Sequence, residues 1–191
     1  SRGAGKTHQE DRKADGSPEL TPYHFNVNAD KYYYPASTVK LPIVLLALQK
    51  LNELKSSGID RNSTMLSETA FSGQTAVFND PTAIDGRPTI ANYIKKILMV
   101  SDNDAYNRLY EFLGQEYIND ELKKKGYKNV QLLHRLNIYL TEAENRHTNP
   151  VKFYDAGGKL LYEQAAKSNT VKYAARKDSL GNAYYAGVKL V

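Results

Sequence analysis

The sequence contains no cysteine, few histidines and no long apolar run, and each shortage excludes a class of protein. Without cysteine the chain cannot form disulfides, use a thiol nucleophile or bind a metal through thiolates. Its 4 histidines are scattered, with no pair at a metal-ligand spacing. The longest apolar run, Leu41 to Leu48, is far too short to cross a bilayer. We therefore expect no metal, no cofactor and no membrane span.

Basic residues outnumber acidic ones, 26 against 21, so the chain carries a net charge of +5. Such a balance raises the question of nucleic-acid binding, and the densest basic cluster is Lys123, Lys124, Lys125 and Lys128. This cluster ends an expected helix just before Gly126, where lysines complement the negative end of the helix dipole. No aromatic residues interleave to stack on bases. We interpret the cluster as a solvated helix end and expect no nucleic-acid partner.

The 191 residues can bury one good core, and the sequence pattern divides the chain into three parts. Residues 1–20 are polar and mixed in charge, and we interpret them as a disordered lead or a leader left from expression. Residues 21–150 form the expected core. Residues 151–191 form an extension rich in β-hairpins.

Periodicity, capping residues and glycine turns predict both helices and strands. Helices are expected at residues 37–54, 89–100, 104–113 and 116–125. Extended segments are expected at residues 23–27, 64–71 and 184–191, with a hairpin that joins 152–155 to 159–162 through Ala156-Gly157-Gly158. The mixture predicts an α+β fold.

Two short motifs carry most of the chemical information. Ser37 begins the long apolar helix, and Lys40 lies one turn further along the same face. A serine hydroxyl is a poor nucleophile until a base removes its proton, and a lysine held neutral by burial can do so at neutral pH. Later in the chain, Ser101, Asp102 and Asn103 separate two more expected helices.

In this order and helical setting, the Ser-x-x-Lys and Ser-Asp-Asn motifs resemble those of the serine β-lactamase and penicillin-binding protein superfamily, and of class A β-lactamases above all. The resemblance implies a mostly helical subdomain that contains the buried Ser-x-x-Lys helix, beside an incomplete antiparallel sheet. It also implies a bacterial protein outside the cytoplasm, periplasmic or anchored at the surface. Its substrate would be a small molecule or a peptide, β-lactams included.

The resemblance assigns a role to each motif residue. Ser37 would be the acylated nucleophile, and its backbone N–H would form half of an oxyanion hole. Lys40 would accept the proton of Ser37, and Ser101 would relay a proton to the leaving group. Asn103 would bind both Lys40 and the substrate amide, whereas Asp102 is interpreted as a capping carboxylate. The alternative is that these serines are ordinary helix-start residues.

One departure from the family concerns release of the acyl group. Class A enzymes carry a loop of the form Arg-x-Glu-x-x-Leu-Asn-Glu-Ala, whose Glu activates the deacylating water. The matching stretch, residues 135–143, has Asn137 at the position of that Glu and Thr141 at the position of the loop Asn. An amide cannot take a proton from water. We therefore expect slow deacylation.

A second departure concerns how this loop is tied. The family pairs the loop arginine with an Asp near the end of the loop, and His147 stands at that position here. Arg135 therefore needs another partner, for which Glu142 and Glu144 are the candidates.

The third departure is the missing Lys-Thr-Gly motif of the family. After residue 150 the nearest string is Lys167-Ser168-Asn169, which lacks the glycine. The chain ends on the apolar stretch Val188 to Val191, and we interpret it as truncated before that motif. The 191-residue chain alone is therefore expected to be inactive and to label weakly with penicillins.

Three functions are compatible with these patterns. The first is a serine hydrolase that is acylated on Ser37 and deacylates slowly, such as a D-Ala-D-Ala peptidase, an esterase or a weak β-lactamase. The second is a catalytically degenerate relative that acts as a binding or scaffold module, which the three departures favour. The third is an adhesion protein whose residues 151–191 make the contacts. The sequence carries no indication of an oligomeric state.

Overall fold

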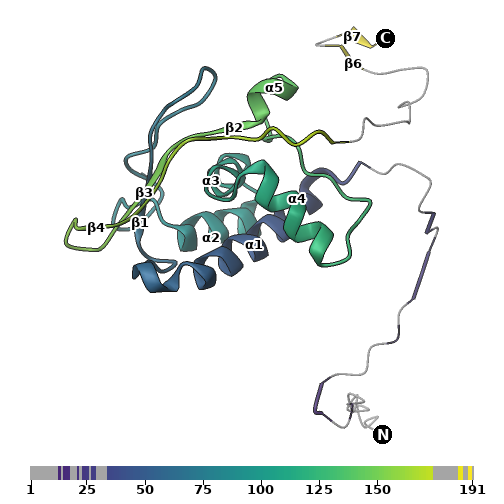
Figure 1. Ribbon diagram of the computed structural model, residues 1–191, viewed down its shortest axis with the longest axis horizontal. Helices are drawn as coiled ribbons and strands as arrows, with labels where there is room; N and C mark the ends of the chain where they lie inside the picture. Colours follow the sequence, from purple (N-terminus) through teal and green to yellow (C-terminus); the bar gives the residue numbers. More distant parts are fainter. Residues whose placement is uncertain are drawn as a thin grey trace, which may run out of the picture. The chain divides into compact units, whose positions relative to one another are not determined.

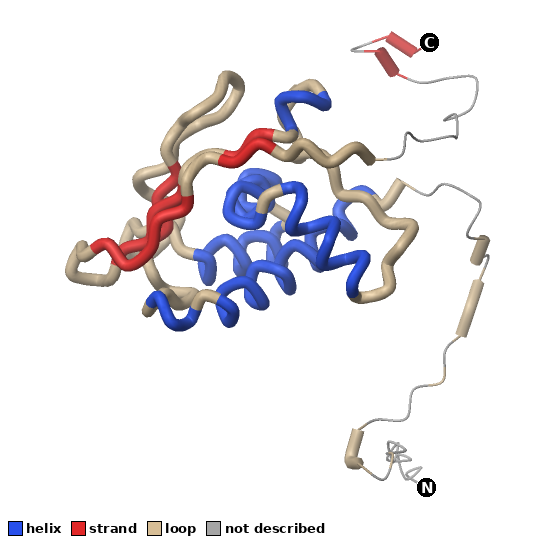
Figure 2. The backbone as a smooth tube through the Cα atoms, viewed as in Figure 1, coloured by secondary structure: helices blue, strands red, loops and turns tan. Residues whose placement is uncertain are grey.

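The structure, a computed structural model, describes residues 34–173 without a gap, together with residues 13, 15–17, 21, 23–25, 27–28, 185–186 and 189–190. The chain divides into two units, Ser1–Tyr32 and Tyr33–Val191. The second unit contains all helices and strands of the described residues. Figure 2 shows the helices between residues 40 and 124 grouped together, with the strands between residues 147 and 168 along their border.

The helical part is built from four consecutive segments. They are α1 (Lys40–Glu53), α2 (Ile90–Val100), α3 (Asn103–Leu113) and α4 (Gln115–Lys124). The side chain of Thr89 caps α2 by accepting the N–H of Asn92 at 3.1 Å. Such a cap pairs N–H groups that the first turn of a helix cannot pair internally, so a new helix can begin at Thr89. Both α1 and α2 pack against α3, which also contacts α4.

The strands between residues 64 and 168 form two antiparallel ladders. The first has the order β1 (Thr64–Ser67), β3 (Val151–Tyr154) and β4 (Leu160–Gln164). The second joins β2 (His147–Thr148) to β5 (Lys167–Ser168). A short helix, α5 (Glu142–Asn145), precedes β2.

The two ladders belong to one long hairpin. Thr148 faces Lys167 and Val151 faces Gln164, which is the same register on both sides of Pro150. Proline has no N–H to donate, so it interrupts the ladder without changing its register. In Figure 1 this hairpin passes from β1 over α3 toward α5.

The core lies where the apolar faces of the helices meet β1 and β3. The rings of Phe112 in α3 and Phe153 in β3 meet edge to face, with their centroids 5.3 Å apart. The largest fully buried side chains include Tyr93, Tyr106, Tyr110, Phe112, Phe153, Ile43, Met65 and Ile90. Residues from 43 to 153 therefore share one core.

The local predictions are largely confirmed. The helices expected at 89–100, 104–113 and 116–125 are α2, α3 and α4, each displaced by at most one residue at either end. The glycine-turn hairpin is β3 and β4. The helix expected from Ser37 begins instead with a 3-10 turn, η1 (Ala36–Val39), and becomes α-helical at Lys40.

Three expectations differ from the structure. Of residues 23–27, the described ones, 23–25 and 27, have no strand structure, since no described strand offers them a partner. The single strand expected at 184–191 is two, β6 (Tyr185–Ala186) and β7 (Lys189–Leu190), which pair with each other; the other residues of that range lie outside the described part. The boundary expected at residue 150 does not divide the chain into separately packed parts, because β3, after that residue, pairs with β1, before it. Most of residues 1–20 lie outside the described part.

Lys50 is a buried lysine in α1 that forms no ion pair with a described residue. Its ammonium donates to the backbone oxygen of Phe112 and, at 2.7 Å, to Oε1 of Gln164. It also lies 4.4 Å from the centroid of the Phe112 ring. Burial, with a smaller effect of the nearby Lys167 charge, lowers the pKa of Lys50 to about 7.

This pKa predicts how stability depends on pH. Between about pH 7 and the ordinary lysine value of 10.5, the unfolded chain binds a proton at Lys50 that the folded chain has released, so the free energy of unfolding should rise with pH. Lys50→Met should reduce this rise, and Lys55→Met, at an exposed position, should keep it. Urea unfolding at a series of pH values measures the slopes. Equal slopes for Lys50→Met and the unchanged protein would contradict the assignment.

Candidate active site

The first part of the site is the turn that leads into α1. Ser37 lies in η1 and is exposed, whereas Lys40, the first residue of α1, is only 4% exposed. A serine that solvent or substrate can reach therefore lies one turn from a lysine that the protein covers. This difference in burial suits a nucleophile and its base.

The second part is the junction between α2 and α3. Ser101 is the C-cap of α2, and its N–H donates to the carbonyl of Ile97 at 3.0 Å. Asp102 is the N-cap of α3, and its side chain accepts the N–H of Ala105 at 2.8 Å. Asp102 is therefore a capping carboxylate, as its position in the sequence suggested. Asn103 is the first residue of α3.

The amine of Lys40 brings the two parts together. Its Nζ lies 3.3 Å from Oγ of Ser37 and 2.9 Å from Oγ of Ser101. It lies 2.6 Å from Oδ1 of Asn103 and 2.5 Å from the backbone oxygen of Ser101. Three side chains of the two motifs, those of Ser37, Ser101 and Asn103, thus converge on the amine of Lys40.

The chemistry of these partners determines what the amine can do. The carbonyl oxygen of Ser101 and Oδ1 of Asn103 can only accept hydrogen bonds. Both therefore accept N–H groups of the Lys40 amine, and the amine also lies within hydrogen-bond distance of the hydroxyls of Ser37 and Ser101. Burial lowers the pKa of Lys40, and the charge of Asp102 opposes this shift. One buried amine and two hydroxyls are therefore in contact where α1 and α3 begin.

Unusual backbone angles mark the same places. Within the described residues, the non-glycine residues with positive φ are Ala36 at 47°, Ser101 at 57° and Asn137 at 54°. Such angles cost free energy and persist where the surroundings hold them, often at functional sites. Ala36 immediately precedes Ser37, and the other two are candidate site residues. Asparagine tolerates this conformation better than most residues.

Helix α3 also supports the loop that carries Asn137. The side chain of Asn107 donates to the carbonyl of Leu136 at 2.9 Å and accepts its N–H at 2.8 Å. Asn137 follows directly and is exposed. Because Asn103 and Asn107 lie one turn apart on α3, the same helix face holds Lys40 and fixes the loop.

Arg135 is paired with Glu111 of α3, which corrects the expectation that Glu142 or Glu144 replaces the missing Asp. The closest contact joins Nη2 of Arg135 to Oε1 of Glu111 at 2.7 Å, and both side chains are 3% exposed. Glu111 also accepts the N–H of Asn149 at 2.5 Å, so one carboxylate ties both ends of the loop.

The two expected partners act elsewhere. Glu142 pairs with Arg146, four residues further along the chain. Glu144 forms a capping box with Thr141 at the start of α5. His147, at the position of the family's Asp, stacks on Phe71 with ring centroids 4.2 Å apart.

The sequence contained a signal for Asn107 and Glu111. Both continue the spacing of four residues that starts at Asn103, so three polar side chains share one face of a helix otherwise rich in apolar residues. The string Lys167-Ser168-Asn169, by contrast, is not part of the site. Lys167 lies beside Gly114, at the opposite end of α3 from Asn103.

The described residues contain no group of three or more His, Cys, Asp or Glu side chains placed to hold a metal ion. Within the same part of the chain, no helix is long and apolar enough to cross a membrane.

The structure is that of an α+β protein in which the amine of one buried lysine contacts the hydroxyls of two serines. A model of the beta-lactamase enzyme family matches residues 19–175. The chain therefore belongs to the beta-lactamase enzyme family. The comparisons with curated proteins and with solved structures found no match.

The Arg135–Glu111 pair predicts a large effect on stability. Glu111→Gln leaves a buried arginine without its counter-charge, which should lower the free energy of unfolding by about 3 kcal/mol. Glu142→Gln removes an acid that is exposed, and it should change stability little. Urea unfolding of both variants near neutral pH measures the difference. Similar losses in the two variants would contradict the assignment of Glu111 as the loop partner.

Proposed function

We propose that this protein is a serine hydrolase of the β-lactamase and penicillin-binding type, which forms an acyl-enzyme on Ser37 and releases it slowly. The observation that carries the proposal is the contact of one buried amine, that of Lys40, with the hydroxyls of both Ser37 and Ser101. An ordinary helix-start serine has no need of a buried lysine, and burying a lysine costs free energy.

Acylation follows from these contacts. Oγ of Ser37 attacks the substrate carbonyl carbon while its proton passes to the lone pair of Lys40. The proton then moves through Oγ of Ser101 to the leaving nitrogen or oxygen, as the bond from that atom to the carbonyl carbon breaks. Asn103 uses its amide oxygen on Lys40, so its NH₂ group is free to donate to a substrate carbonyl.

Deacylation is the weak step. Water must lose a proton to attack the acyl group, and the loop presents Asn137, an amide, where the family has a carboxylate. Slow release suits a D-Ala-D-Ala peptidase, an esterase or a weak β-lactamase. A location outside the cytoplasm fits such substrates and the absence of cysteine.

A second candidate is a degenerate relative that binds ligands or partners without turnover. Asn137 favours this candidate. The position of Lys167 away from the site favours it too, because no strand of the described residues then takes the place of the family's Lys-Thr-Gly strand. The two candidates differ in whether a covalent adduct forms.

The proposal predicts a long-lived adduct. After the natural full-length protein is mixed with benzylpenicillin, intact-mass spectrometry should show one added penicilloyl group that maps to Ser37, and Ser37→Ala should show none. Asn137→Glu should restore a general base and shorten the adduct lifetime about 100-fold or more, whereas Asn137→Gln should not. Absence of any adduct in the folded protein would favour the binding module. Rapid turnover in Asn137→Gln would mean that another base exists.

The proposal also distinguishes two buried lysines on one helix. Lys40→Met should slow acylation of Ser37 by roughly 100-fold or more, because the hydroxyl loses its base. Lys50→Met removes an equally buried lysine at the other end of α1 and should leave the acylation rate nearly unchanged. The rate of adduct formation measures both variants, with circular dichroism as the folding control. Equal slowing in both variants would show that the effect is structural rather than catalytic.

A further inference from the structure

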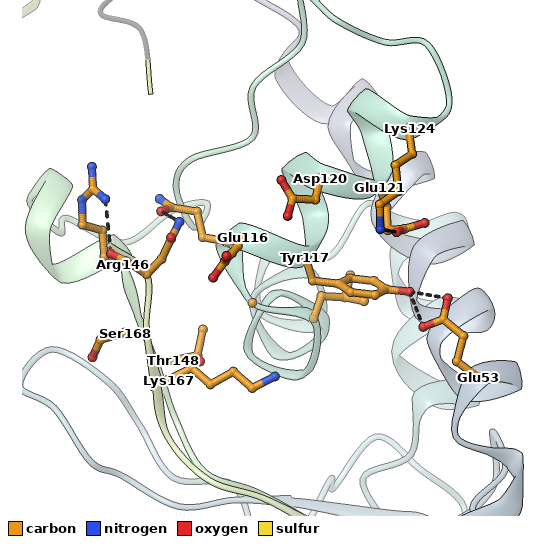
Figure 3. Close-up of a pocket in the computed structure, with 14 residues that line it drawn as sticks. Glu53, Glu116, Tyr117, Asp120, Glu121, Lys124, Arg146, Thr148, Lys167 and Ser168 are labelled. Carbon is orange, nitrogen blue, oxygen red and sulfur yellow. Dashed lines mark hydrogen bonds and ion pairs between the residues drawn. The ribbon is translucent and has the colours of Figure 1, made fainter. Parts of the chain in front are cut away.

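A cavity with a volume of about 480 Å³ lies between α4 and the β2–β5 part of the hairpin (Figure 3). We refer to it as the α4 pocket. The residues that matter here are Glu116, Tyr117 and Asp120 of α4, Thr148 of β2, and Lys167 of β5. Cavities of this size are typical of small-molecule sites.

The α4 pocket is separate from the active site. Glu53, at the C-terminal end of α1, lines the pocket, whereas Lys40 is the first residue of α1. At 1.5 Å per residue, these two ends are about 20 Å apart. Leu113, also in the lining, is likewise at the opposite end of α3 from Asn103. A ligand in this pocket would not contact Ser37.

One wall of the pocket has unused groups that suit an anion. Thr148 and Lys167 are cross-strand partners, so their side chains are neighbours on one face of the ladder. Thr148 is 1% exposed, and its hydroxyl has no hydrogen-bond partner. The ammonium of Lys167 has neither an ion pair nor a hydrogen bond with any described residue. Lys167 is exposed, so an unpaired ammonium there is ordinary, whereas an unpaired buried hydroxyl such as that of Thr148 is rare in native proteins and calls for a physical reason.

The start of α4 adds to this wall. Gly114 is the N-cap of α4 and offers no side chain to its first N–H groups. Gly114 and the first residues of α4 line the pocket. The positive end of the helix dipole and free N–H groups favour a negative group there. Burial lowers the pKa of Lys167, and the charge of Glu116 opposes this only in part, so a bound anion would stabilise the ammonium further.

The α4 side of the pocket suits a cation. Glu116 and Asp120 lie one turn apart on α4, and both are exposed. Neither carboxylate has an ion pair or a hydrogen bond with a described residue. The other acids in the lining are already used, because Glu53 accepts from the hydroxyl of Tyr117 at 3.0 Å and Glu121 pairs with Lys124 at 2.7 Å. Figure 3 shows Glu116, Tyr117 and Asp120 on the α4 side and Thr148 and Lys167 on the strand side.

We propose that the α4 pocket binds a small zwitterion, an amino acid or a dipeptide. Its carboxylate would lie at Lys167, the hydroxyl of Thr148 and the first N–H groups of α4, and its ammonium at Glu116 and Asp120. A simple anion would be repelled by the two carboxylates, and a simple amine by Lys167, so the mixed charges select a ligand that carries both. The ring of Tyr117, whose hydroxyl is held by Glu53, supplies a flat wall for the ligand's backbone.

Isothermal titration of the 191-residue chain with three matched probes tests this proposal. Glycylglycine carries both charges, N-acetylglycylglycine lacks the ammonium, and glycylglycinamide lacks the carboxylate. Only glycylglycine should bind measurably, and each blocked probe should bind at least about tenfold more weakly. Lys167→Met and Asp120→Asn should each weaken glycylglycine binding by a similar factor. Lys128→Met, an exposed lysine outside the pocket, should have no effect.

Amide chemical-shift changes locate the ligand independently of any variant. Glycylglycine should shift the amide signals of Gly114 to Tyr117 and of Thr148, and it should leave those of Ser37 and Lys40 unchanged. Equal binding of either blocked probe would overturn the proposal in favour of a simple ion site. Shifts centred on Ser37, or no binding at millimolar concentrations, would also overturn it. None of these results depends on whether Ser37 can be acylated.

Discussion

The buried amine of Lys40 is the contact on which the arrangement of the site depends. Because Lys40 is only 4% exposed, its amine needs hydrogen-bond partners from the protein, and they come from η1 and from the junction of α2 and α3. The same contacts hold Ser101 at a positive φ, a conformation that persists only when the surroundings fix it. The burial of Lys40 and the strained backbone of Ser101 thus depend on the same contacts, which lie where α1 and α3 begin. A smaller or polar residue at position 40 would release both.

Helix α3 is the common support for everything around that amine. Asn103 holds Lys40, Asn107 fixes the backbone beside Asn137, and Glu111 pairs with Arg135 and accepts the N–H of Asn149. These three residues repeat every four positions, so they lie along one face of α3. In the family, the acid that pairs with the loop arginine lies near the end of the loop itself. Here that acid is Glu111, which lies on α3. The contacts of Lys40 and the position of the loop that carries Asn137 are therefore coupled through one helix.

The sequence predicted those features that short-range chemistry decides. Helices α2, α3 and α4 were predictable because caps and apolar spacing are local signals, and Lys40 with Ser101 because both motifs occur together. The partner of Arg135 could not be predicted in this way. Which of Glu111, Glu142 and Glu144 lies beside Arg135 depends on how α3 packs against the loop. For the same reason the sequence suggested a boundary at residue 150, although β3 pairs with β1. Long-range strand pairing and the choice among equivalent charges require the tertiary structure.

The central claim is that burial makes Lys40 lose its proton more readily than an ordinary lysine, as the proposed base for Ser37 must, and its side chain can be observed directly. The protein should be labelled with ¹³C at the lysine Cε positions, and the signal of Lys40 assigned from Lys40→Met. Titration of that signal with pH should give a midpoint below 10.5, the ordinary value for lysine. A midpoint at or above 10.5 would show that Lys40 is a stable cation, and it would contradict the account of how Ser37 is activated.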